Sequence, residues 1–253
     1  MTIYNKTSQI IKSSTPKIWV FLRSTINMSK KFFIIYDFPV TYYEGLNAIF
    51  LQVPKNATST TLSLILKKLD ISFDDKDYHS IHQNSQKFII DKKTLVEKTV
   101  NGGIFLFTFS RNPYARLISC YKDKITIEKD IDFFNDFFGT FTPNMNFKRF
   151  AENVCRIPDF WANTHFKSQC SFIFLKNVPK PNFIGKVENY SEDIKVIQEV
   201  LRLPKLNQSF NITSESYNLS EWYNKDLAKK IYRRYKQDFI RLNYEPNFEQ
   251  FPN

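Results

Sequence analysis

Apolar residues in this chain occur either in short continuous runs or in longer stretches with a helical repeat. Continuous runs lie at residues 31–38 (KFFIIYDF), 48–53 (AIFLQV) and 102–110 (GGIFLFTFS), and each is rich in β-branched or aromatic residues. Such runs predict buried strands. Weaker runs of the same kind lie at 171–175 (SFIFL) and 183–187 (FIGKV). Because the runs are continuous rather than alternating, we expect both faces of the sheet to be covered.

Helical repeats follow two of these runs. Residues 58–71 begin with Ser and Thr, which are favourable helix-start residues, and their apolar positions recur on one face, at Leu62, Ile65, Leu66 and Leu69. Residues 113–125 open with proline and repeat apolar residues at helical spacing, at Leu117, Ile118, Tyr121 and Ile125. Further helices are expected at 146–157 and 191–203, and one long basic helix at 224–242.

The alternation of strands and helices predicts an α/β fold, a three-layer sandwich with a central, mostly parallel sheet. We expect residues 1–253 to form a single domain, with its core at about 45–245 and an irregular N-terminal arm at 1–30 that is rich in Ser, Thr, Lys and Asn. Oligomeric state does not follow from this pattern.

Charge narrows the class of partner. The net charge is +11 and the pI near 9.4, so we expect an anionic ligand such as a nucleotide phosphate, nucleic acid, anionic lipid or acidic polysaccharide. Three cysteines without CxxC spacing argue against a disulfide framework or a zinc site. The most apolar N-terminal stretch, 18–22, is far too short to span a bilayer, and we expect a cytoplasmic protein without an integral membrane span.

The turn between the strand at 48–53 and the next helix carries Lys55 and the hydroxyl residues Thr58, Ser59 and Thr60. In parallel sheets ligands bind beyond the carboxyl ends of the strands, where helix N-termini hold anions. The turn therefore predicts a phosphate site that works like a P-loop without its glycines. No GxxxxGK[ST] motif is present, which disfavours a nucleoside triphosphatase or a P-loop kinase.

A second turn, after the strand at 102–110, offers Arg111, with Ser119 eight residues further on in the following helix. Arginine suits a phosphate dianion because its planar guanidinium donates two hydrogen bonds in parallel. Two anion sites at neighbouring strand ends favour a ligand with two separated charged groups, such as a 3′,5′-substituted nucleotide.

These two turns resemble known motifs. VPKNATSTT (53–61) is similar to the 5′-phosphosulfate loop, and RNPYARLISCY (111–121) to the 3′-phosphate motif, of sulfotransferases that use 3′-phosphoadenosine 5′-phosphosulfate (PAPS). FIGKVENYSEDIKVI and YRRYKQDFIRLNYE resemble later segments of the carbohydrate sulfotransferases related to heparan sulfate 2-O-sulfotransferase and the chondroitin enzymes. The likeness runs in order from about 48 to 245 and is nearest to bacterial-type members.

The resemblance implies roles for residues of both turns. The 5′-phosphosulfate would be bound by Lys55, Asn56, Ala57, Thr58, Ser59 and Thr60, and the 3′-phosphate by Arg111 and Ser119. Lys55 would also neutralise charge on the bridging oxygen as the sulfuryl group leaves. PAPS would be the co-substrate, adenosine 3′,5′-bisphosphate the product, and a sugar or polysaccharide the acceptor, with no metal and no nucleic acid involved.

The acceptor hydroxyl needs a base to take its proton, and the chain has three histidines that could serve. Relatives place a histidine between the two nucleotide motifs, so His79 and His82 are the candidates, with His79 ranked first; a histidine near its ordinary pKa suits this role. His165 and Gln169 resemble a family segment near the acceptor cleft and are expected to bind substrate.

Other interpretations remain open at this point. The Ser and Thr cluster can be an ordinary helix N-cap, His79 and His82 can lie in a solvated loop, and a carboxylate such as Asp77 can serve as the base. The main alternative function is a basic module that binds nucleic acid or nucleotide without transfer. It is disfavoured because the chain lacks the interleaved basic and aromatic pattern of single-strand binders.

Overall fold

The computed structural model describes residues 39–126, 140–205 and 217–253. The strand expected at 31–38 and the arm expected at 1–30 lie outside the described residues. Within them the protein has a four-stranded sheet in the order β1 (Val40–Tyr43), β2 (Ala48–Leu51), β3 (Phe105–Ser110), β4 (Phe183–Lys186). β1 pairs antiparallel with β2, whereas β2–β3 and β3–β4 are parallel. The expected α/β fold with a mostly parallel sheet is confirmed.

Helices cover both faces of the sheet. Phe50 of β2 and Phe107 of β3 point to one face and pack against α3 (Thr58–Lys68) and α10 (Tyr190–Leu201). Their neighbours Ile49 and Leu106 point to the other face and pack with Leu95 of α5 (Lys92–Val100). Successive side chains of each strand point to opposite faces of the sheet, and both faces are covered by helices. This explains why the strand sequences are continuously apolar.

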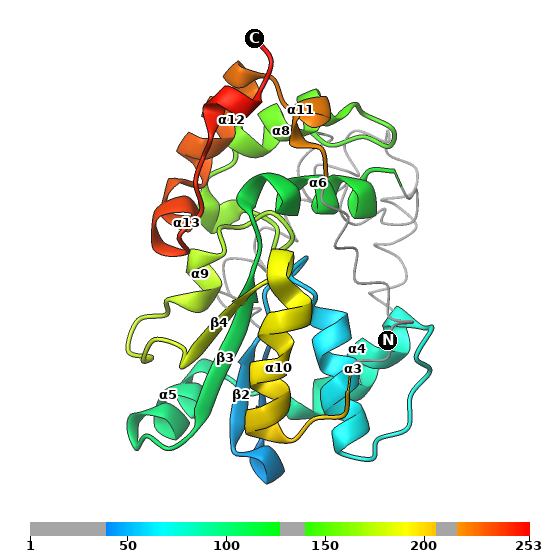
Figure 1. Ribbon diagram of the computed structural model, residues 1–253, viewed down its shortest axis with the longest axis vertical. Helices are drawn as coiled ribbons and strands as arrows, with labels where there is room; N and C mark the ends of the chain where they lie inside the picture. The colour runs from blue at the N-terminus through cyan, green and yellow to red at the C-terminus, as the bar shows by residue number, and fades with distance from the viewer. Residues whose placement is uncertain (1–38, 127–139, 206–216) are drawn as a thin grey trace, which may run out of the picture.

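A helical layer lies beyond the carboxyl ends of β2 and β3 (Figure 1). It shares one buried aromatic core and consists of α6 (Pro113–Lys124), α8 (Phe147–Arg156), α9 (Cys170–Ile173), α11 (Leu219–Trp222), α12 (Lys225–Arg234) and α13 (Lys236–Arg241). α4 (Tyr78–Ser85) packs beside α3. The turns that follow β2 and β3 lie between the sheet and this layer.

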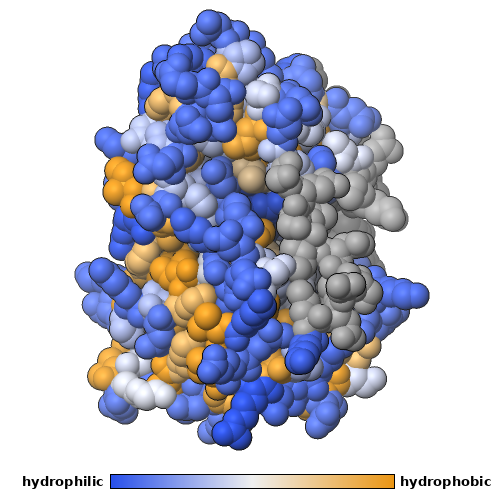
Figure 2. Space-filling model, in the orientation of Figure 1, coloured by the Kyte–Doolittle hydropathy of each residue, from blue (hydrophilic) through white to orange (hydrophobic). Residues whose placement is uncertain are grey.

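The face turned to the viewer is mainly hydrophilic, with hydrophobic side chains in scattered patches (Figure 2). In the part of the chain that the structure describes, helices fall short of the length and apolarity needed to cross a membrane.

Two expected elements are wrong. Residues 171–175 are not a strand, because residues 170–173 form α9: the buried carboxylate of Asp238 accepts the backbone N–H groups of Gln169 and Cys170 at 2.8 Å and fixes the start of this helix. The long helix expected at 224–242 is divided into α12 and α13 at Tyr235, whose backbone leaves the helical conformation (φ −113°, ψ 25°) while its hydroxyl donates to the Phe166 carbonyl at 2.6 Å.

Candidate active site

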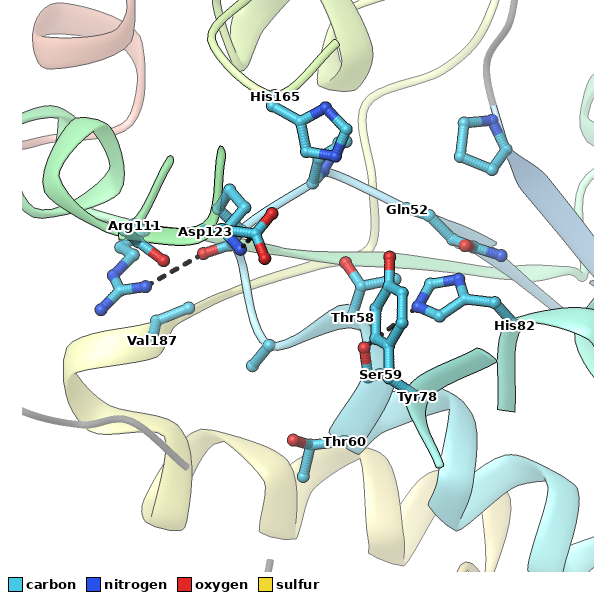
Figure 3. Close-up of a pocket in the computed structure, with 15 residues that line it drawn as sticks. Gln52, Thr58, Ser59, Thr60, Tyr78, His82, Arg111, Asp123, His165 and Val187 are labelled. Atoms are coloured by element: carbon cyan, nitrogen blue, oxygen red, sulfur yellow. Dashed lines mark hydrogen bonds and ion pairs between the residues drawn. The ribbon is translucent and has the colours of Figure 1, made fainter. Parts of the chain in front are cut away.

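A cavity of about 360 Å³ opens at the carboxyl ends of β2 and β3 (Figure 3). Its wall combines the turn after β2 and the start of α3, the turn after β3, one face of α6, α4, and the segment before α9. The lining residues are Pro39, Gln52, Pro54, Lys55, Ala57, Thr58, Ser59, Thr60, Tyr78, His82, Arg111, Ser119, Asp123, His165 and Val187. Both turns expected to bind anions therefore face one cavity.

The turn after β2 has an unusual backbone. Lys55 and Ala57 have positive φ values of 71° and 56°, a region that costs a residue with a Cβ atom roughly 1–2 kcal/mol. Alternating left-handed residues turn successive N–H groups toward a common point, which makes an anion-binding concavity. The Thr58 hydroxyl closes the turn by donating to the Val53 carbonyl at 2.8 Å. Because α3 begins at Thr58, its free N-terminal N–H groups are available on the same side.

The two turns are tied together by buried polar groups. Arg111, which is 4% exposed, donates from Nη1 to the Lys55 carbonyl at 3.2 Å. Asn56 donates from Nδ2 to the Phe109 carbonyl and to Gln169 Oε1, both at 2.7 Å. Gln169 in turn accepts the Arg111 N–H at 2.9 Å and donates to the Arg111 carbonyl at 2.8 Å. The spacing of the two turns is therefore fixed by the protein before any ligand binds.

Most residues expected at the site line the cavity, and three do not. Gln169 is completely buried and all of its amide groups contact Asn56 or Arg111, so it holds the turns and does not reach a substrate. Asn56 lies beside it, 1% exposed. His79 lies on α4 with an exposed side chain and is not among the lining residues, whereas His82, one helical turn further on, is.

His82 contacts the start of α3, just after the Lys55 turn. Its Nε2 lies 3.0 Å from the Ser59 hydroxyl, and its ring centroid lies 4.4 Å from that of Tyr78. Burial, with a smaller contribution from neighbouring His79, lowers the pKa of His82 below its ordinary value. His82 is therefore a neutral hydrogen-bonding partner of Ser59 at neutral pH.

Asp123 is a cavity residue that the sequence analysis missed. Its Oδ2 lies 3.3 Å from Nζ of Lys55 and 3.4 Å from Nζ of Lys124. Burial of Asp123 opposes ionisation, but the ammonium groups of Lys55 and Lys124 outweigh it, and the pKa of this carboxyl lies below its ordinary value. Asp123 follows Ser119 by four residues, so helical spacing from Ser119 was the signal that could have found it.

Arg116 of α6 is another residue that the sequence analysis missed, and it is only 3% exposed. Its guanidinium donates to three backbone carbonyls: Pro54 at 3.0 Å, Lys167 at 2.6 Å and Thr164 at 3.2 Å. One side chain thus joins the Lys55 turn to the segment that carries His165. The sequence places Arg116 at a buried position of an amphipathic helix, which marks an arginine that must have internal partners.

The fold and site define an α/β protein with two coupled turns at its strand ends, both of which face one cavity. Residues 42–245 match the model of the sulfotransferase family, and the chain belongs to that family. A similar protein is carbohydrate sulfotransferase 12 of Xenopus laevis, 28% identical over an alignment of 173 residues that covers 54% of this chain and 39% of the relative. The chain thus spans well under half of that relative's length. No solved structure matches the chain significantly.

Proposed function

We propose that this sulfotransferase takes the sulfuryl group from PAPS and transfers it to a hydroxyl of a sugar or polysaccharide. One observation carries the donor assignment: the Lys55 turn and the Arg111 turn open on the same cavity and are joined by the 3.2 Å hydrogen bond from Arg111 to Lys55. A ligand with phosphate groups at both ends of a nucleoside matches this pair of sites.

The residues present fit such a nucleotide. The left-handed turn at Lys55 and Ala57 and the first turn of α3 offer backbone donors for the 5′-phosphosulfate, and the hydroxyls of Ser59 and Thr60 line the same cavity. The Thr58 hydroxyl instead closes the turn by donating to the Val53 carbonyl. Arg111 and Ser119 line the part of the wall proposed for the 3′-phosphate. When bound, PAPS supplies an activated sulfuryl group attached to a good leaving group.

Lys55 is placed to stabilise the leaving group. Its ammonium lies beside Asp123, which holds the side chain within the cavity rather than in solvent. Charge that develops on the bridging oxygen as the sulfuryl group departs would be met by this ammonium, and a charge placed in advance needs no reorganisation. The carboxylate of Asp123 limits how tightly Lys55 binds the ground state.

A sugar acceptor is supported by two observations. The similar Xenopus protein is named a carbohydrate sulfotransferase. In addition, the adjacent residues Phe160 and Trp161 are 71% and 48% exposed just before the segment that carries His165, and they offer aromatic surface on which a sugar ring could pack. The net charge of +11 suits an acceptor that is itself anionic.

The donor proposal is tested by ligand-dependent melting. Adenosine 3′,5′-bisphosphate should raise the melting temperature more than ATP or AMP at equal concentration. Arg111→Ala should remove this preference, whereas the matched control Arg149→Ala, at an exposed position on α8, should keep it. Equal protection by ATP in the wild-type protein would refute the donor proposal. Labelled PAPS offered with a panel of polysaccharides then identifies the acceptor.

A further inference from the structure

His165 lies on the cavity wall contributed by the segment before α9. Its ring extends toward the space between Asp123 and Gln52 (Figure 3). Its Nδ1 is 2.7 Å from Oδ1 of Asn163, and its backbone N–H donates to the same oxygen at 3.0 Å. An amide oxygen only accepts, so Nδ1 must carry the ring proton and Nε2 must carry the lone pair. The contact with Asn163 therefore sets the tautomer of the His165 ring.

The position of His165 relative to Lys55 is fixed through Arg116. The guanidinium holds the carbonyls of Thr164 and Lys167, on either side of His165, and also the carbonyl of Pro54, next to Lys55. A group oriented by buried hydrogen bonds on both flanks keeps the precise geometry that proton transfer needs.

The next residues on the same segment are anchored as well. The Phe166 carbonyl accepts from the Tyr235 hydroxyl at 2.6 Å, and the Gln169 N–H donates to the buried Asp238 at 2.8 Å. His165 is thus carried by a segment fixed to α12, α13 and α6, unlike His82, which is carried by α4 on the other side of the cavity.

The other two histidines are less suited to accept a proton. Nε2 of His82 is already in contact with the Ser59 hydroxyl, which belongs to the turn proposed for the donor's 5′ end. His79 is exposed and outside the cavity lining. His165 alone among the three combines a fixed tautomer, a place on the wall and a rigid link to Lys55.

We propose that His165 is the catalytic base of the transfer, with Asn163 and Arg116 as its positioning residues; this inference rests on the proposed function. Nε2 of His165 accepts the proton of the acceptor hydroxyl while that oxygen forms its bond to sulfur. The bond between sulfur and the bridging oxygen breaks, and its electron pair stays on the 5′-phosphate of the departing nucleotide, facing Lys55. Each bond formed is matched by one broken, and no oxidant or metal enters the step.

The charged groups that face His165 are Lys55, Asp123, Lys124 and Arg116. Burial, followed by the nearby ammonium groups of Lys124 and Lys55, lowers the pKa of His165 to about 3, so its lone pair is free at neutral pH. An anionic donor bound beside Lys55 would offset the part of this shift that comes from the ammonium groups, while the larger part, which comes from burial, would remain.

The tautomer can be tested without knowing the acceptor. In ¹⁵N NMR of the full chain with adenosine 3′,5′-bisphosphate, His165 should show a protonated Nδ1 and an unprotonated Nε2 from pH 5 to 8. His79→Ala and His82→Ala assign the signals, since the chain has only three histidines. Asn163→Ala should abolish the preference for one tautomer. A proton on Nε2 of the wild-type ring would overturn the proposal.

Transfer from labelled PAPS, to desulfated chondroitin and to water, tests the catalytic role. His165→Ala should lower kcat by roughly 10²- to 10⁴-fold, with adenosine bisphosphate affinity unchanged, and added imidazole should restore part of the rate. His82→Ala should act mainly on donor affinity, and Gln83→Ala, an exposed neighbour on α4, should change neither quantity. A fully active His165→Ala overturns the proposal. If the wild-type protein fails to bind the bisphosphate, the proposed function fails instead, and the NMR result still reports on the base.

Discussion

The side-chain amide of Gln169 pairs with the backbone of Arg111 as one residue of a β-ladder pairs with another. Its Oε1 accepts the Arg111 N–H at 2.9 Å, and its Nε2 donates to the Arg111 carbonyl at 2.8 Å. The same oxygen also accepts from Asn56 of the other turn. A completely buried glutamine thereby sets the distance between two cavity-lining turns that are far apart in sequence.

Gln169→Leu should weaken both folding and donor binding. The substitution removes the Gln169 partner of the Arg111 N–H and carbonyl and one of the two acceptors of Asn56 Nδ2, and a buried polar group that loses its partner costs about 1–3 kcal/mol. Urea unfolding measures the stability, and titration with adenosine 3′,5′-bisphosphate measures the affinity. Gln86→Leu, at an exposed position, is the control and should leave both unchanged. A stable Gln169→Leu protein with normal affinity would show that the turns are held by other contacts.

Gly185→Ala should destabilise the protein although glycine here has an ordinary backbone. A Cβ atom at this position would lie 2.5 Å from Cε1 of Phe109, a completely packed ring between β3 and α10. Overpacking of this kind costs roughly 1–3 kcal/mol. Gly45→Ala is a matched control, because nothing lies within 4 Å of the Cβ built there. Equal unfolding midpoints in urea for the two variants would contradict the packing argument.

Asp123→Asn should bind adenosine 3′,5′-bisphosphate several-fold more tightly than the wild-type protein, because Lys55 is no longer shared with a carboxylate and one repulsive charge is gone. The gain should shrink at high salt. Isothermal titration at two salt concentrations measures both effects. Weaker binding by this variant would mean that Asp123 orients Lys55 for the ligand rather than competing with it.

The same ion pair makes a small contribution to stability. The pKa of Asp123 is lowered in the folded state, so its contribution is present above the ordinary carboxyl pKa and is lost as pH falls through the folded value. Because the side chain is 37% exposed, we expect less than about 1 kcal/mol. The difference in unfolding free energy between wild type and Asp123→Asn should be measurable at pH 7 and vanish in acid.

His165 should make the protein sensitive to mild acid. Its pKa is near 3 in the folded state and near 6.5 in the unfolded chain, so below about pH 6.5 the unfolded state binds a proton that the folded state does not. Stability should then fall by up to about 1.4 kcal/mol per pH unit as pH decreases. His165→Asn should remove this part of the slope in urea unfolding between pH 7 and 5. An identical slope in both proteins would mean that the folded protein protonates His165 freely.

The spacing of apolar residues was sufficient to predict the strands and helices that carry the site. The apolar run at 48–53 and the helix after it became β2 and α3, and 102–125 became β3 and α6, so Lys55 and Arg111 were placed correctly at strand ends. These predictions succeeded because a buried strand and an amphipathic helix are each recognised from the spacing of apolar residues within the segment itself, without knowledge of distant contacts.

Tertiary contacts decided what the sequence could not. Residues 171–175 have the composition of a strand, but a carboxylate some 65 residues away caps them as a helix. Gln169 resembled a substrate ligand, and only the folded chain shows that it is enclosed. His79 and His82 differ by less than one helical turn, so their ranking depended on the orientation of α4, which is set by packing on α3.

The anchoring of Gln169 links α13 to the two turns that line the cavity. Asp238, in α13, accepts the backbone N–H groups of Gln169 and Cys170 and the side-chain hydroxyl of Ser168, and so keeps Gln169 between the two turns. A truncation before α13 would remove only about the last 18 residues, none of which lines the cavity. It would nevertheless remove the carboxylate that holds Gln169 between the two turns, so tags or deletions at this end require the same caution as changes in the turns themselves.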